Sequence, residues 1–161
     1  MAQKAFLRRV STLLRKAPWM ASSAMLLWRW RQARFSAGVA GVVFNLEGQV
    51  LLVEHVFHPH APWGLPGGWV DHRESPANAL RREMKEELAL DVNVGPVLLV
   101  ELDFGNHLDL AYLCHATSPI GRLSSELLDH GWFDTVSLPR LHKFHYYAIL
   151  RAVDMHTKVI P

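Results

Sequence analysis

The sequence predicts a mixed α/β (α+β) fold, a sandwich of sheet and helices, preceded by a helical N-terminal extension. Strand-like segments come first, a strongly helical segment follows, and further strands precede a final helix. Half of the 161 residues are apolar, which suffices for the core of one domain of ordinary size. Residues 1–34 differ sharply in charge from residues 35–161. We therefore predict an extension over 1–34 and one domain over 35–161.

The extension is strongly basic. Residues 1–34 contain eight Lys or Arg and no acid, whereas the rest of the chain has nine Lys or Arg against fifteen acids. Residues 4–16 place apolar side chains on one helical face, and Pro18 interrupts that pattern. Ser22 or Ser23 is positioned to cap a second, Trp-rich helix. We expect two short amphipathic helices.

From residue 35 onward, strand patterns alternate with two helical patterns. The strand-like segments are residues 37–45, 50–55, 92–104, 108–117 and 127–134. The first two are predicted to pair as a hairpin around the turn LEGQ, and the next two flank the turn GNH. A loop rich in His, Pro and Gly precedes a helix over residues 76–89, and a helix over 141–156 closes the chain.

The helix over residues 76–89 has a clear start and two distinct faces. Ser75 occupies the N-cap position and Pro76 the first helical position, where a missing N–H is tolerated. Glu83, Glu86 and Glu87 share one face because they are spaced i, i+3, i+4. The apolar residues at helical spacing, which are expected to face the core, are Ala77, Leu80, Met84 and Leu88.

Like charges at this spacing repel, by about 0.2–0.5 kcal/mol per solvated pair. The simplest interpretation is a solvated helix with salt bridges. Its context favours a binding site instead, because Gly67 and Gly68 permit a close approach of backbone to a ligand and Glu74 precedes the helix. Carboxylates that converge in this way suit Mg²⁺, which proteins usually hold together with substrate phosphates. The cluster therefore predicts a divalent cation and a phosphate substrate.

The segment from Gly68 to Leu90 resembles the signature of the Nudix hydrolases. That pattern is Gly, five residues, Glu, seven residues, then Arg-Glu-apolar-x-Glu-Glu-x-Gly-apolar. Every defining position matches except the last glycine, which is Ala89 here. An alanine at that position is expected to lengthen the helix or to strain its end, without removing a carboxylate. The resemblance covers about residues 36–155 and not the extension.

The resemblance implies a Nudix hydrolase domain over residues 35–161, folded as an α/β/α sandwich of a mixed sheet between helices. Such a domain hydrolyses the pyrophosphate linkage of a nucleoside diphosphate derivative with Mg²⁺ (or Mn²⁺). Nucleotide sugars, ADP-ribose-like compounds and nucleoside triphosphates all remain open as substrates. Two alternatives are an RNA 5′-end pyrophosphohydrolase and a non-catalytic Nudix-fold module for binding or regulation. Carried over by position, Arg82 would orient the glutamates and Glu74 would support the site. The implied metal ligands are Glu83, Glu86, Glu87 and the backbone of Gly67 and Gly68.

Further candidates lie outside the signature. His58 and His60 are expected to contact substrate phosphate, and Trp63 either stacks on the substrate or packs beneath the glycine turn. The general base is left open among Glu126, a loop histidine and the last two glutamates of the signature. Two residues near the GNH turn are expected to face the same cleft: His107 and Asp109.

The extension admits three roles: docking in a homodimer, peripheral contact with an anionic membrane through residues 1–34, or organelle targeting. Nucleic acid is less favoured, because no recognised binding module accompanies the charge. No apolar run reaches the roughly 18 residues of a membrane-spanning helix. The single cysteine, Cys114, precludes a disulfide within the chain and suits a reducing compartment. We expect a cytoplasmic location, with organelle or membrane association as the alternative, and a small-molecule nucleotide as the main partner.

Overall fold

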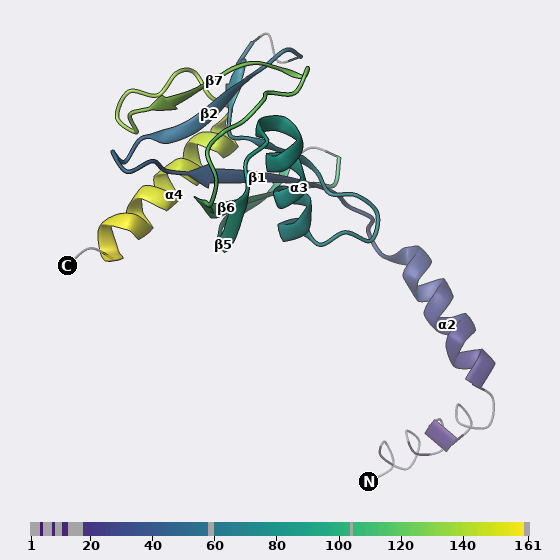
Figure 1. The fold of residues 1–161 in the computed structure, drawn as a ribbon. Coiled ribbons are helices and arrows are strands. Elements are labelled where there is room, and N and C mark those ends of the chain that lie inside the picture. The colour runs from purple at the N-terminus through teal and green to yellow at the C-terminus, as the bar shows by residue number, and fades with distance from the viewer. Residues whose placement is uncertain are drawn as a thin grey trace. The chain divides into compact units, whose positions relative to one another are not determined.

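The computed structural model describes residues 18–57, 60–103 and 105–159, together with Lys4, Arg8, Ser11 and Thr12. The chain divides into two compact units, residues 1–34 and 35–161, and helix α2 (Pro18–Arg31) belongs to the first. The elements of the second unit are β1 (Ser36–Val43), β2 (Val50–His55), β3 (Trp63–Gly64), β4 (Gly67–Trp69), α3 (Pro76–Leu88), β5 (Val92–Asp103), β6 (His107–Ala116), β7 (Leu127–Phe133) and α4 (Lys143–Val159) (Figure 1).

The strands form two sheets. The larger has the order β4-β1-β6-β5, in which β1 and β6 run parallel and the other pairs run antiparallel. The smaller is antiparallel, with the order β3-β2-β7. The larger sheet is therefore mixed, as the resemblance to the Nudix hydrolases implied.

Helices α3 and α4 cover opposite faces of β1. Val39 and Val43 belong to the core cluster that contains the buried side of α3, whereas Ala40 and Val42 belong to the cluster that contains α4. This division follows from the alternation of side chains along a strand. Figure 1 shows β1 passing between the two helices. The predicted α/β/α sandwich is thus confirmed.

The predicted hairpin between the first two strands is wrong. β1 and β2 lie in different sheets, and a single bridge between Phe44 and Val50 links them. The connecting turn does form, with a bond of 3.0 Å from the N–H of Asn45 to the carbonyl of Gln49. Both strands are largely buried, as strands covered on both faces must be. β1 pairs with β4 and β6, and β2 pairs with β3 and β7.

Two short strands, β3 and β4, lie in the segment that was predicted as a loop, whereas β5, β6, β7 and the two helices of this unit lie close to their predicted positions. β5 and β6 form the predicted antiparallel pair, and Gly105 and Asn106 between them both have positive φ angles. Helix α3 ends at Leu88, and α4 begins two residues later than expected, at Lys143. Cys114 is buried on β6, which confirms its place in the core.

Helix α2 differs from its prediction in two ways. It begins at Pro18, so Ser22 and Ser23 lie inside the helix and cap nothing, and the hydroxyl of Ser23 bonds to the carbonyl of Trp19 at 2.9 Å. Proline is well suited to a first helical turn. The helix is also not amphipathic, because exposed Trp28 and Trp30 are two positions apart and therefore lie on opposite sides. The predicted helix over 4–16 falls almost wholly outside the described residues.

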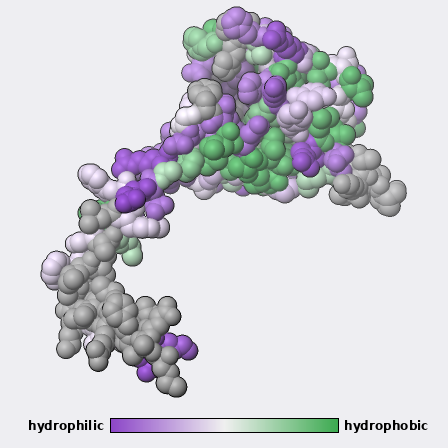
Figure 2. Space-filling view, turned by 180° about the vertical axis from the view of Figure 1, so that it is seen from behind, coloured by the Kyte–Doolittle hydropathy of each residue, from purple (hydrophilic) through white to green (hydrophobic). Residues whose placement is uncertain are grey.

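No helix within the described ranges combines the length and the apolar character needed to cross a bilayer. Large apolar side chains are nevertheless exposed in both units. In α2 they are Trp19, Met25, Leu26, Trp28 and Trp30. On β5, at the edge of the larger sheet, they are Val97, Val100 and Leu102. Figure 2 shows hydrophobic residues gathered in a band on one side of the 35–161 unit.

Candidate active site

The placement of α3 fixes the direction of its glutamates. Ser75 has an extended backbone and its hydroxyl accepts the N–H of Asn78 at 3.3 Å, so it is the predicted N-cap, and Pro76 follows at the first position. Leu80 and Met84 are fully buried against the sheet. With this side anchored in the core, the acidic side of the helix faces strand β4.

The helix ends through a left-handed residue. Ala89 has a φ of 49°, and its N–H bonds to the carbonyl of Lys85 at 3.0 Å, so the helix is not lengthened. Such a conformation is ordinarily left to glycine, because the Cβ of other residues crowds the backbone. Gly121 provides the room, since a Cβ built there would lie 2.8 Å from the Cβ of Ala89. The N–H of Gly121 also bonds to the carbonyl of Leu88 at 2.8 Å.

Arg82 is the hub of the acidic face. Its guanidinium contacts Glu83 at 2.8 Å, Glu86 at 3.2 Å and the carbonyl of Trp69 at 2.9 Å. It also forms a forked pair with Glu74, at 3.0 and 3.3 Å. The hydrogen bond from Arg82 lowers the pKa of Glu74, and the surrounding carboxylates raise the pKa of Arg82 in return. One cation thus holds three carboxylates and the end of β4 in place.

Glu87 is the exception, because it is buried and has no cationic partner among the described residues. Its Oε2 accepts the N–H of Gly67 at 2.9 Å. Burial raises its pKa to about 8, the Gly67 bond opposes that shift, and the negative charges of Glu83, Glu126 and Glu86 add to it. At neutral pH, and with no cation bound, this carboxyl therefore holds a proton.

The two glycines of β4 let the acids approach the backbone. A Cβ on Gly68 would lie 2.5 Å from the carboxyl carbon of Glu83. A Cβ on Gly67 would collide with the carbonyl oxygen of Val39 on β1, and Gly67 has a φ of 151° that other residues rarely adopt. The carboxylates of α3 therefore lie directly against a strand that has no side chains at these two positions.

The donor set was tested for its fit to a divalent cation. Within the described residues, no three His, Cys, Asp or Glu side chains form a ready-made metal cluster. Arg82 engages Glu83 and Glu86, and Gly67 engages Glu87, so the ligands must exchange partners when a cation binds. The donors are hard oxygens, and the mutual repulsion that raises the pKa of Glu87 would be relieved by a cation. The chemistry of these donors therefore fits a hard divalent cation.

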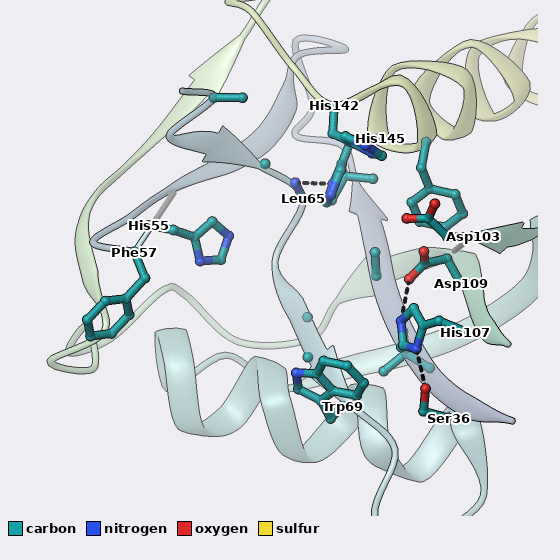
Figure 3. Close-up of a pocket in the computed structure, with 18 of the residues that line it drawn as sticks. Ser36, His55, Phe57, Leu65, Trp69, Asp103, His107, Asp109, His142 and His145 are labelled. Atoms are coloured by element: carbon teal, nitrogen blue, oxygen red, sulfur yellow. Dashed lines mark hydrogen bonds and ion pairs between the residues drawn. The ribbon is translucent and has the colours of Figure 1, made fainter. Parts of the chain in front are cut away.

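A cavity of about 780 Å³ adjoins β4 on the side covered by α4 (Figure 3). Gly67 and Gly68 form part of its wall, so the strand stands between the cavity and the acids of α3. Its described lining includes aromatic rings, histidines and two acids, but no Lys or Arg. The labelled polar and aromatic residues are Ser36, His55, Phe57, Trp69, Asp103, His107, Asp109, His142 and His145.

The candidate site residues that lie outside the signature occupy different positions in the structure. Trp63 lines the cavity and meets the ring of Phe133 edge to face, with centroids 4.9 Å apart, and its stacking on a substrate stays a prediction. His60 is exposed at the cavity, and His58 lies outside the described residues. Glu126 is exposed, and its negative charge contributes to the raised pKa of Glu87.

Several cavity residues were not singled out from the sequence. His145 on α4 accepts the N–H of Leu65 at 2.8 Å, which ties the closing helix to the segment before β4. Ser36 and Trp69 flank His107, which the sequence did suggest. Their one sequence signal is strand alternation, which cannot reveal that β1 and β6 are neighbours.

A family model described as the NUDIX domain matches residues 34–152 of this chain. The chain belongs to the NUDIX family. Among solved structures, the MutT NUDIX hydrolase from Burkholderia pseudomallei is 30% identical with a TM-score of 0.65, over 74% of this chain and 98% of that chain. The resemblance drawn from the signature and the NUDIX fold are both confirmed.

Two curated NUDIX-like relatives are also similar to this chain. An 8-oxo-dGDP phosphatase from Mus musculus is 29% identical over 74% of this chain and 38% of its own length. An RNA pyrophosphohydrolase from Psychrobacter cryohalolentis is 32% identical over 53% of this chain and 49% of its own length. The chain thus spans less than half of either relative.

Proposed function

We propose that this NUDIX protein is a pyrophosphohydrolase that cleaves the pyrophosphate linkage of a nucleoside diphosphate derivative with the help of Mg²⁺ (or Mn²⁺). The observation that carries the proposal is the contact between α3 and β4. Glu83 fills the space left by Gly68, and Glu87 accepts the N–H of Gly67, beside a cavity large enough for a nucleoside.

The cation would be held by Glu83, Glu86, Glu87 and the backbone of Gly67 and Gly68. When bound, it supplies charge neutralisation for the phosphates and a lowered pKa for the attacking water. The contribution of Arg82 is orientation, because its planar guanidinium already holds Glu83 and Glu86 on one side of the helix. Glu74 fixes Arg82 in turn through the forked pair.

Exposure to solvent reduces the number of candidates for the general base. Glu86 and Glu126 are both exposed, and the charges of both reach Glu87. Glu87 is buried and bonded to Gly67. Arg82 bonds both the half-buried Glu83 and the exposed Glu86, so exposure alone distinguishes Glu86 from Glu83. We assign the proton-accepting role to one of the two exposed carboxylates. Kinetics of the variants Glu86→Gln and Glu126→Gln identify the base. Loss of the base should lower kcat sharply and abolish the dependence of kcat on pH in the acidic range.

The lining of the cavity favours binding of the nucleoside part of the substrate. Its described lining is rich in aromatic rings and has no Lys or Arg, so it suits an uncharged ring system better than phosphate. Trp63 and His60 line this cavity and would contact the substrate there. The similarity to a protein named 8-oxo-dGDP phosphatase favours nucleoside di- and triphosphates within the substrate class.

The test is hydrolysis of a substrate panel with Mg²⁺, with Mn²⁺ and with chelator. The panel spans nucleoside di- and triphosphates, ADP-ribose, nucleotide sugars and triphosphorylated RNA. Glu87→Gln keeps a neutral acceptor for the Gly67 N–H and should lower kcat at least about a hundredfold. Glu47→Gln, in an exposed turn remote from the signature in sequence, is the matched control and should leave kcat unchanged. Turnover that survives both chelation and Glu87→Gln would refute the proposal.

An RNA 5′-end pyrophosphohydrolase is the second candidate, favoured by the Psychrobacter relative and by the basic residues of 1–34. In that case, affinity for triphosphorylated RNA should fall steeply with salt. Turnover of nucleoside triphosphates alone excludes it. Metal binding without turnover of any substrate would instead establish a non-catalytic module.

Two partner hypotheses concern surfaces rather than chemistry. A homodimer would best use the exposed apolar edge of β5, where Val97, Val100 and Leu102 lie. Peripheral membrane contact would use α2, where exposed Trp residues accompany Arg29 and Arg31. Sedimentation equilibrium tests the first. Co-sedimentation with anionic and with neutral vesicles, compared between wild type and Trp28→Ser, tests the second.

A further inference from the structure

Three strands of the larger sheet place one row of residues across the wall of the cavity. Gly38 on β1 is paired with Trp69 on β4 and with Asp109 on β6. In the adjacent row, Ser36 on β1 is paired with His107 on β6. Directly paired residues point to the same face of a sheet. All five therefore share the face on which the cavity lies, as Figure 3 shows for the four labelled residues.

The absence of a side chain at Gly38 lets the neighbouring groups meet above it. A Cβ there would lie 2.8 Å from Oδ1 of Asp109 and 3.1 Å from Nε2 of His107. The His107 ring lies beside the indole of Trp69, with centroids 4.6 Å apart, and 64% of Trp69 is exposed. Together the two rings form an accessible aromatic surface that ends at a carboxylate.

Hydrogen bonds fix the direction in which this carboxylate acts. Nε2 of His107 lies 3.2 Å from Oδ1 of Asp109, and Nδ1 lies 2.8 Å from Oγ of Ser36. In the tautomer that carries its proton on Nε2, His107 turns this N–H toward Asp109 and accepts the Ser36 hydroxyl proton at Nδ1. Asp109 is thereby held as an acceptor on the cavity wall, with lone pairs left for a ligand.

Charge determines which part of a nucleotide can reach this position. The described lining has no Lys or Arg. It contains a second acid, Asp103 on β5, which lies opposite His107 in the register of β5 with β6. These acids disfavour phosphate and favour N–H donors. The phosphates belong near Gly67, two residues from Trp69 along β4, which corresponds to about 6–7 Å. That spacing suits a ribose between the phosphates and a base on the aromatic surface.

We propose that Asp109 recognises the base of the nucleotide and selects a guanine-type edge, while the base packs against Trp69 and His107. Guanine presents two adjacent donors, the ring N1–H and the 2-amino group, which match the two oxygens of a carboxylate. Adenine and cytosine present one amino group beside an acceptor nitrogen, and uracil presents one N–H between two carbonyls. Ser36 and His107 are positioning residues for Asp109. This inference rests on the proposed function for the identity of the ligand as a nucleotide.

The test measures binding rather than turnover. Calorimetric titration of the full chain, with divalent cations chelated, compares GMP, IMP and UMP, which contain no anhydride to hydrolyse. GMP should bind at least about tenfold more tightly than UMP, with IMP between them because it lacks the 2-amino group. Asp109→Asn replaces one acceptor with a donor and should abolish this preference. Asp129→Asn, at an exposed position on β7, is the control and should retain it.

The positioning role has its own readout. Ser36→Ala removes the hydroxyl that fixes the tautomer of His107, so it should reduce the GMP preference while leaving UMP affinity unchanged. A role confined to folding would weaken both ligands equally. Equal affinity of the wild type for the three nucleotides, or no binding of any at millimolar concentration, overturns the inference, as does equal weakening by Asp109→Asn. Selective GMP binding without hydrolysis of any substrate would refute only the proposed function, and hydrolysis without base preference only this inference.

Discussion

Ala89 shows how a single departure from the family signature is accommodated. Its left-handed backbone costs about 1 kcal/mol relative to glycine. We therefore expect Ala89→Gly to raise the free energy of unfolding by up to about 1 kcal/mol, measured by urea denaturation. The helix end and every carboxylate are unchanged by this substitution, so catalytic constants should stay constant.

The contact between Ala89 and Gly121 provides a sharper version of that test. Gly121→Ala should cost about 1–3 kcal/mol in the wild type, because the new Cβ would lie 2.8 Å from that of Ala89. In the Ala89→Gly background the obstruction is gone, so the cost should be smaller. A double-mutant cycle measures the difference. Strictly additive effects would mean that Gly121 does not accommodate the Ala89 side chain.

Arg82 is a second residue whose chemistry is specific. A lysine in its place has three donors on one nitrogen and cannot make the five bonds of Arg82 to Glu74, Glu83, Glu86 and the carbonyl of Trp69. Arg82→Lys should lower kcat by about 10–100-fold while the protein remains folded, as judged by circular dichroism and steady-state kinetics. The matched control is Arg81→Lys, since Arg81 bonds to the carbonyl of Ala77 and to Oδ1 of Asn78, both within its own helix turn. Equal effects of the two changes would contradict the orienting role.

At the scale of the element, substitutions at the two glycines of strand β4 should affect activity and stability separately. Gly68→Ala meets only the flexible end of Glu83, which can move away, so we expect kcat to fall about 10–100-fold with little change in Tm. Gly67→Ala meets the backbone of Val39 at a positive φ, so it should lower the free energy of unfolding by about 1–3 kcal/mol. Thermal unfolding and kinetics on the same two variants check both. The reverse pattern would show that Glu83 is not positioned by Gly68.

The elements that could be predicted from the sequence are those whose signals lie within one short segment. Helix α3 was predictable because its cap, its apolar spacing and its glutamates are local signals within one short segment. The β5–β6 pair was predictable from its turn. The first hairpin was predicted wrongly, because a turn does not say whether two buried strands pair with each other. The group around Asp109 depends on Ser36 and His107, which are 71 positions apart and meet only through the parallel pairing of β1 with β6.

At the scale of the whole molecule, the buried acid of the site sets the pH dependence of stability. The pKa of Glu87 is raised from 4.5 to about 8 in the folded chain, so the folded state holds the proton more tightly than the unfolded state. This stabilisation is fully present below pH 4.5 and is lost as the pH rises through 8. With divalent cations chelated, the free energy of unfolding should therefore fall by up to about 1.4 kcal/mol per pH unit across that window. In Glu87→Gln the fall should be shallower, and identical slopes would contradict the burial of this charge.

A bound cation should reverse that dependence, because it favours the ionised form of the same carboxyl. Near pH 7, binding of Mg²⁺ to the folded chain must displace the proton held by Glu87, so up to one proton should be released per cation bound at this site. Titration calorimetry in buffers of different ionisation enthalpy measures this number. The affinity should rise between pH 6 and pH 8, and Glu87→Gln should abolish the release. Tight binding without proton release would place the cation away from Glu87, and would separate the site of metal binding from the contact between α3 and β4 on which the proposed chemistry depends.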